Sequence, residues 1–315
     1  MRSYNRKIII TINWFMTPTQ RAYLELHIAV FLFGFTAILG DLIQLSALLI
    51  VWWRVLLTSI SLAFVIRVGR LFRTLPRKKV LMFMGIGVIV AVHWVTFYGA
   101  IKLSNASIGV VAMATTSFFT SLIEPMIMRQ RVKWYELLLG LLIIPGIALI
   151  VKSTDLSMIR GLLVGLLSAF LAALFATLNK KFITHSDERS ITFLEMGSAW
   201  LFLSIVIPIY SLSYGIPMDI WPPSLIDWGY LLILALLCTT LAYVLALRSL
   251  QHLSAFASNL SINLEPVYGI VLAWILLNEN EELNSGFYLG SAIIVLAVFS
   301  YPLVKKRFAA VAQPG

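Results

Sequence analysis

Ten apolar segments, each about as long as a bilayer is thick, account for most of this 315-residue chain. A helix needs about 20 apolar residues to cross a hydrocarbon core of about 30 Å, and most of the segments reach that length. The composition agrees, because 60% of the residues are hydrophobic and 12% are charged, about half the charged share of a soluble protein. We therefore expect an all-α polytopic membrane protein with ten transmembrane helices. The segments are 27–44, 46–66, 80–98, 105–128, 135–151, 160–178, 191–212, 228–247, 255–277 and 285–303.

Lysine and arginine residues fall almost entirely on one side of this arrangement. If the N-terminus lies in the cytoplasm, 20 of the 24 basic residues lie on the cytoplasmic side. Lys102, Lys152 and Arg160 fall on the other side, and Arg54 lies inside the second segment. Because cytoplasmic loops are enriched in basic residues, we expect an integral, multi-pass protein of the cell (inner) membrane with its N- and C-termini in the cytoplasm.

The two ends of the chain, residues 1–26 and 304–315, are expected to be short cytoplasmic segments. In the first, the apolar run from Ile8 to Met16 is too short to span a bilayer, and no small-residue cleavage site follows it. A signal peptide is therefore not expected. One interpretation of this run is an amphipathic anchor, and the other is a natural start of the protein at Met16.

The two halves of the chain repeat one another, since the fourth segment matches the ninth at an offset of 149 residues. The loop 129–133 after the fourth segment is basic, whereas the loop 278–282 after the ninth is acidic. Five segments per half is an odd number, so the two copies are expected to cross the membrane in opposite orientations. The sequence thus predicts two inverted five-helix repeats, residues 27–151 and 160–303, an arrangement found in many secondary transporters.

A sequence pattern in the ninth segment is repeated more weakly in the fourth. It reads Leu-Ser-Ala-Phe-Ala at 253–257, Leu-Glu-Pro-Val-Tyr at 264–268 and Asn-Glu at 278–279. With the opening stretch His-Ile-Ala-Val-Phe-Leu-Phe-Gly-Phe-Thr at 27–36, this pattern resembles the EamA-type members of the drug/metabolite transporter superfamily. The resemblance covers about residues 22–307 and implies a ten-helix transporter; members move amino acids, nucleosides, sugar phosphates and drugs. One departure is Ser117, where the family often has a proline, the proline of this segment being Pro125.

Polar side chains form a stripe along the ninth segment. At about 100° per residue, one narrow arc holds Ser254, Ser258, Ser261 and Glu265. A carboxylate within an apolar span must face protein or a water-filled cavity and is often functional. We interpret Glu265 as a substrate-binding or proton-coupling group, the alternative being a structural acid bonded to the serines. Asn259 and Asn263 either bind substrate or form hydrogen bonds to a neighbouring helix.

Three polar residues of the first half are further candidates. Arg54 lies too deep in the second segment to reach the membrane surface easily. His93 in the third segment is interpreted either as a proton relay or as a hydrogen-bonded core residue. Glu124 precedes Arg129 by five residues, so it is either a coupling residue or a partner of the basic loop.

These candidates define a predicted site. The predicted substrate-binding residues are Arg54, His93, Asn259, Ser261, Asn263 and Glu265, and the predicted coupling residues are Glu265 and Glu124. Because an unpaired guanidinium in a span is costly, we predict that Arg54 pairs with Glu265 in the empty protein. An anionic substrate group would then displace Glu265, since the planar guanidinium suits a carboxylate or phosphate. The alternative is a permanent ion pair that only locks the helices together.

The predicted function is secondary transport of a small polar metabolite, an amino acid-like or other organic anion or zwitterion, by alternating access with proton coupling or exchange. The chain has no G-x-x-x-x-G-K-S/T, H-E-x-x-H or G-x-S-x-G motif, so we expect neither an enzyme nor a bound cofactor. Two other classes remain open: a membrane-embedded enzyme acting on a lipid or isoprenoid, and a non-transporting scaffold or sensor.

The expected partners are a small-molecule substrate and the lipid bilayer, for a monomer or homodimer. The net charge of +10 could suggest a nucleic acid, but the basic residues lie in short loops rather than on one patch, so none is expected. Cys238 is the single cysteine and lies inside an apolar segment. It offers no disulfide framework, and no metal site is expected.

Overall fold

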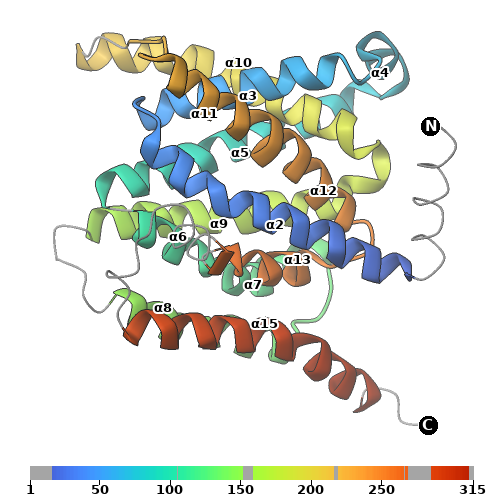
Figure 1. The fold of residues 1–315 in the computed structure, drawn as a ribbon. Coiled ribbons are helices and arrows are strands. Elements are labelled where there is room, and N and C mark those ends of the chain that lie inside the picture. Colours follow the sequence, from blue (N-terminus) through green and yellow to red (C-terminus); the bar gives the residue numbers. More distant parts are fainter. Residues whose placement is uncertain are drawn as a thin grey trace, which may run out of the picture.

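The computed structural model describes residues 16–104, 106–151, 159–215, 219–265, 267–268 and 285–311. All regular structure within these residues is helical, and the long helices run side by side in one bundle (Figure 1). The first half holds α2 (Pro18–Leu42), α3 (Ala47–Ala63), α4 (Val68–Thr74), α5 (Arg77–Leu103), α6 (Ala106–Ala114), α7 (Thr116–Met128) and α8 (Trp134–Val151). The second half holds α9 (Ile159–Phe182), α10 (Glu188–Tyr214), α11 (Leu225–Ala235), α12 (Ala242–Ser249), α13 (Ala255–Ile262) and α15 (Ser285–Val311).

Five stretches of helix among the described residues are long and apolar enough to cross a membrane. They are Pro18–Leu42, Arg77–Leu103, Ile159–His185, Glu188–Tyr214 and Leu225–Ser249. A sixth arises if α3 and α4 are taken together, although they are bent by 88°. Large side chains such as Leu201, Ile205 and Leu296 point outward from the bundle, as expected of surfaces that face lipid. These helices agree with a polytopic membrane protein, but they do not confirm ten spans in two inverted repeats.

Two places in the first half differ from straight predicted spans. The second segment corresponds to α3, and α4 follows it at a bend of 88°. The fourth segment divides into α6 and α7, which meet at Thr115. Both the N–H and the hydroxyl of Thr115 bond to the carbonyl of Ala112, at 3.1 and 2.7 Å. These bonds to a residue three positions back compete with the α-helical pattern. The break therefore precedes Ser117, and Pro125 lies inside α7.

The predicted ends of the chain are partly helical. α2 begins at Pro18, where Thr17 and Gln20 form a reciprocal capping box, so it starts well before the predicted span. α15 continues to Val311 and takes in most of the predicted C-terminal tail. The run from Ile8 that suggested an anchor or a later start lies outside the described residues, apart from Met16.

Two apolar clusters hold the bundle together. The larger one joins α3, α5, α10, α11 and α12 and includes the fully buried Phe83, Tyr98 and Leu203. The smaller one joins α2, α8, α13 and α15 around Leu26 and Phe256. α8 and α15 lie side by side along one edge of the bundle, and the start of α2 and the end of α15 lie at the same end of it (Figure 1).

Candidate functional site

A cavity of about 110 Å³ lies between helices of the two halves. One buried water needs about 10–15 Å³, so the cavity holds several waters or part of a small organic molecule. Aromatic and aliphatic side chains form most of its wall, and a few polar groups converge on it, the usual composition of a ligand pocket. Its polar and charged lining residues are Thr36, Arg54, His93, Thr116, Asn179, Tyr243, Ser258, Asn259 and Glu265.

Arg54 is held at the cavity wall by neutral groups. Its Nε donates to the hydroxyl of Thr239, its Nη1 to the hydroxyl of Tyr98 at 2.9 Å, and its Nη2 to the carbonyl of Cys238 at 3.4 Å. Its guanidinium carbon lies 4.0 Å from the centre of the Trp94 ring, in range of a cation–π interaction. The residue is 2% exposed. Arg54 is thus a buried positive charge with no carboxylate among its contacts in the described part of the chain.

The predicted pair between Arg54 and Glu265 is wrong for this structure. Both residues line the cavity, but Glu265 is half-buried and accepts a hydrogen bond from Thr36 at 3.4 Å. The reason lies in the π-helical turn Leu236–Leu241 between α11 and α12, which brings a hydroxyl and a carbonyl to the guanidinium. Such turns are frequent at functional sites. The cation is stabilised without Glu265, and its charge stays available to a bound anion.

His93 lines the cavity and is fixed by Ser168. Its Nδ1 lies 2.9 Å from the Ser168 carbonyl oxygen and 2.8 Å from the Ser168 hydroxyl, which itself donates to the His93 carbonyl at 2.8 Å. Its ring centre is 5.2 Å from that of Phe175. The hydrogen-bonded interpretation of His93 is therefore confirmed, while a role in proton transfer stays a prediction.

The two asparagines of α13 form hydrogen bonds across to α7. Asn259 donates to Thr120 at 2.7 Å, and Asn263 donates to Ser117 at 2.9 Å. These bonds confirm the interhelical alternative for both residues. Of the predicted substrate-binding residues, the cavity wall includes Arg54, His93, Asn259 and Glu265, and it does not include Ser261 or Asn263.

Ser261 and Ser254 of the predicted polar stripe form hydrogen bonds within their own helix. Ser261 donates to the carbonyl of Ala257 at 2.9 Å, and Ser254 accepts the N–H of Ala257 at 3.1 Å as the cap of α13. Ser258 and Glu265, by contrast, reach the cavity. The stripe therefore divides into residues that start and stabilise the helix and residues that face the candidate site.

Glu124 binds the start of α13 rather than the basic loop. Its two carboxylate oxygens accept the N–H groups of Ala255 at 3.0 Å and Phe256 at 2.7 Å. The N-terminus of a helix carries free N–H groups and a partial positive charge, which a carboxylate satisfies. The predicted ion pair with the loop is thus wrong. Glu124 joins the two halves, and its predicted coupling role remains untested by this geometry.

Several residues of the cavity were not identified from the sequence. Thr36, Asn179 and Tyr243 are single polar residues in apolar helices, and nothing in their spacing marks them. Asn179 and Tyr243 also contact the buried carboxyl of Glu195. The sequence signal for these residues is a polar side chain inside an apolar span. The same signal also marks polar residues that do not line the cavity.

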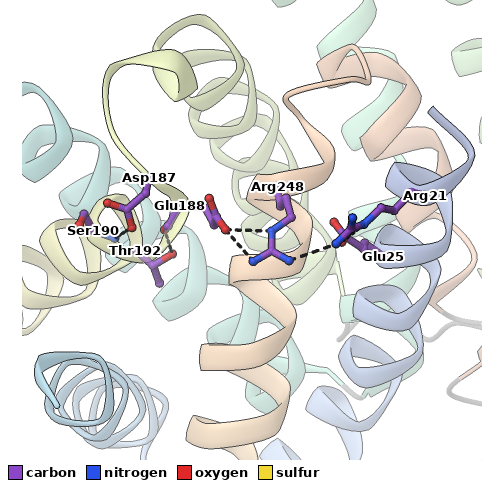
Figure 2. A network of polar contacts seen from close by, with 7 residues as sticks. All are labelled: Arg21, Glu25, Asp187, Glu188, Ser190, Thr192 and Arg248. Carbon is purple, nitrogen blue, oxygen red and sulfur yellow. Dashed lines mark hydrogen bonds and ion pairs between the residues drawn. The ribbon is translucent and has the colours of Figure 1, made fainter. Parts of the chain in front are cut away.

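An ion-pair network lies at the end of the bundle at which α2 and α10 begin and α12 ends. Figure 2 shows Arg248 between Glu188 and Glu25, with Arg21 beside Glu25. Arg248 donates to Glu188 from Nη2 at 2.6 Å and from Nε at 2.8 Å, and to Glu25 from Nη1 at 3.4 Å. Its neighbours Leu247 and Leu250 line the cavity, so the network lies next to the candidate site.

The fold and the cavity define a helical membrane protein with a polar site between two halves of its chain. Comparison with known families agrees: the model of the EamA-like transporter family matches residues 20–152 and again residues 159–301. The chain belongs to this family, which confirms the resemblance deduced from its sequence. It is an integral membrane protein of the transporter class.

Two curated relatives carry names of the same kind. "Uncharacterized transporter YetK" of Bacillus subtilis (strain 168) is 23% identical over 301 residues, which are 91% of this chain and 88% of that protein. "Uncharacterized transporter sll1164" of Synechocystis sp. (strain ATCC 27184 / PCC 6803 / Kazusa) is 23% identical over 215 residues, 65% of this chain and 60% of that protein.

A solved structure described as "Crystal structure of protein" has the same fold. It superposes with a TM-score of 0.71 at 15% identity and covers 91% of this chain and 98% of its own. At this identity the likeness concerns the fold alone.

Proposed function

We propose that this protein is a secondary transporter that moves a small anionic or zwitterionic metabolite through the cavity between its halves by alternating access. The observation that carries the proposal is Arg54, a buried guanidinium at the cavity wall that is held by neutral groups. A planar guanidinium binds a carboxylate or phosphate through two parallel hydrogen bonds. Glu265 and Asn259 would contact the polar remainder of the substrate.

The cavity draws its wall from both segments that match the family model. Phe33, Arg54 and Trp94 come from the first, whereas Phe175 and Tyr243 come from the second. A site between two repeats is the position at which rocking of one half against the other exposes it to each side in turn. We propose that the Arg248 network closes one end and separates when the site opens there.

We also propose ten spans in two inverted repeats with both termini in the cytoplasm. The repeated family match and the unequal distribution of basic residues support this topology. In a Cys238→Ala background, single cysteines at Arg131 and Glu281 should react with an impermeant maleimide from opposite sides of the membrane. Glu281 lies outside the described residues. Reaction of both from the same side would contradict inverted halves.

The transport proposal is tested with purified protein in proteoliposomes and a panel of amino acids, organic acids and sugar phosphates. Uptake and counterflow are measured with and without a pH gradient, so that proton coupling and exchange are distinguished. We expect at least one compound with a carboxylate or phosphate to be transported, with Glu265 as the coupling carboxylate if the gradient drives accumulation. Rates equal to those of protein-free liposomes for the whole panel would contradict the proposal.

A further inference from the structure

Glu195 of α10 is a fully buried acid, with 0% of the residue exposed. α5 approaches its backbone closely at Gly87, where a Cβ would collide with Glu195. Tyr243 of α12 donates to Glu195 Oε2 at 2.6 Å, and the amide of Asn179 of α9 donates to the same oxygen at 3.4 Å. Both of these partners line the cavity. The carboxyl therefore lies one residue behind the wall of the candidate site.

No cation compensates this carboxyl among the described residues. The helices that pack around it are α3, α5, α9 and α12, and the titratable group that faces it is Tyr243. Six charged or titratable side chains of these helices bind elsewhere: Arg54 to Tyr98, Lys79 to His185, His93 to Ser168, Lys180 to Leu250, Lys181 to Ile127 and Arg248 to Glu188. The other cations of these helices, Arg77, Lys78, Lys102 and Arg160, are exposed. A buried carboxylate without a cation is unfavourable, whereas the neutral acid is tolerated.

Two oxygens at this site have no hydrogen-bond partner within the described structure. They are Glu195 Oε1 and Asn179 Oδ1, both buried, and both are acceptors when Glu195 is ionised. Buried polar atoms are nearly always satisfied, so an orphaned pair calls for an explanation. A proton on Glu195 Oε1 turns that oxygen into a donor, and the neighbouring amide oxygen is an acceptor. Protonation of Glu195 thus reduces the excess of acceptors at this site, whereas a metal ion would need several more oxygen ligands.

We propose that Glu195 is a proton-binding site of the transport cycle, connected to the cavity through Tyr243 and Asn179. This inference rests on the proposed transport function. On uptake, the Tyr243 hydroxyl proton moves to Glu195 Oε2 while Tyr243 accepts a proton from a hydronium ion in the cavity, which becomes water. A half-turn of the protonated carboxyl then brings this proton to the Oε1 position, and release reverses these steps. Charge and atoms balance, because one proton enters from the cavity and one carboxylate becomes a carboxylic acid.

Glu195 and Tyr243 lie on the two helices that also carry the ion pair between Glu188 and Arg248. Glu195 lies seven residues, or about 10 Å, beyond Glu188 on α10, and Tyr243 precedes Arg248 by five residues on α12. The same two helices thus carry the proton site and the ion pair that separates in the cycle. Ionising Glu195 adds a negative charge between them, which changes the balance between their closed and separated arrangements.

Proton binding is measured by infrared difference spectroscopy of the full-length protein in lipid as the pH is stepped, without any substrate. The wild type should show a titrating carbonyl-stretch band of a protonated carboxyl, and Glu195→Gln should remove it. The matched control is Glu136→Gln, a buried carboxyl of α8 bonded to Lys133 and Tyr301, which should keep the band. Tyr243→Phe retains the carboxyl but removes its donor, so it should shift the band even if Glu195→Gln folds poorly.

The outcomes separate this inference from the transport proposal. A band that survives Glu195→Gln unchanged and disappears in Glu265→Gln would overturn the role of Glu195 while leaving transport through the cavity intact. If the titration of the band changes when choline is replaced by sodium, the site binds a metal cation. That result would also overturn the role of Glu195 as a proton site. Failure of the metabolite panel with the Glu195 band present would instead count against the proposed function alone.

Discussion

Replacing Arg54 with lysine is expected to leave a folded protein that has lost most transport of its anionic substrate. The guanidinium makes three hydrogen bonds through three different nitrogens, and an ammonium cannot reproduce that geometry. Hydrogen bonds to charged groups contribute about 1.5–3 kcal/mol each, so losing one such contact to substrate lowers affinity about 10- to 100-fold. Initial uptake rates against substrate concentration in proteoliposomes measure this loss.

A matched control for this substitution is Arg160→Lys, at an exposed arginine at the start of α9. It should transport as the wild type does. If Arg54→Lys also keeps wild-type uptake, the guanidinium does not bind substrate.

A further check uses Arg54→Leu and Glu265→Leu, alone and combined. Because the structure does not pair these residues, their effects on thermal stability should add; recovery of stability in the double variant would indicate an ion pair.

Replacing Glu124 with glutamine is expected to lower stability more than any other single neutralisation of an acid in this chain. The carboxylate is buried and accepts two backbone N–H groups from α13. A glutamine side chain has one oxygen, so one N–H group at the helix start loses its acceptor. The expected loss is about 1.5–3 kcal/mol, the usual contribution of a hydrogen bond to a charged group. Thermal unfolding in detergent, followed by size-exclusion chromatography, measures it.

The control for Glu124 is Asp41→Asn, which neutralises an exposed carboxylate at the end of α2. It should unfold at the temperature of the wild type, since exposed charges contribute little. The account of Glu124 as the link between halves is refuted if the two variants are equally stable. Unchanged stability of Glu124→Gln together with loss of gradient-driven uptake would restore its predicted coupling role.

The sequence was sufficient to predict an all-helical membrane protein of this family, because apolar length and a motif repeated in both halves are visible in the chain itself. It also identified Arg54, His93, Asn259 and Glu265, which do line one cavity. Those residues stand out because polar groups in apolar spans are costly wherever they point. What a span cannot reveal is which way each such residue faces.

The partners of these polar residues could not be predicted, for a physical reason. The π-helical turn that satisfies Arg54 depends on how α11 and α12 pack, and no local pattern marks it. Glu124 likewise finds the start of a helix about 130 residues further along the chain. Glu195 follows Arg189 by six residues in the sequence, yet its carboxyl contacts Tyr243 of another helix. Such contacts are set by tertiary packing rather than by sequence spacing.

Alternating exposure of the cavity is the central claim, and labelling of one cavity residue tests it most directly. Ala176 of α9 lines the cavity, whereas Ala173 on the same helix is buried and does not. In a Cys238→Ala background, Ala176→Cys should react with an impermeant maleimide added from either side of the membrane, and Ala173→Cys from neither. Arg248→Gln should speed the reaction from the side that the ion-pair network closes. If Ala176→Cys reacts from one side only, both with Arg248 intact and in the Arg248→Gln variant, alternating access through this cavity is contradicted.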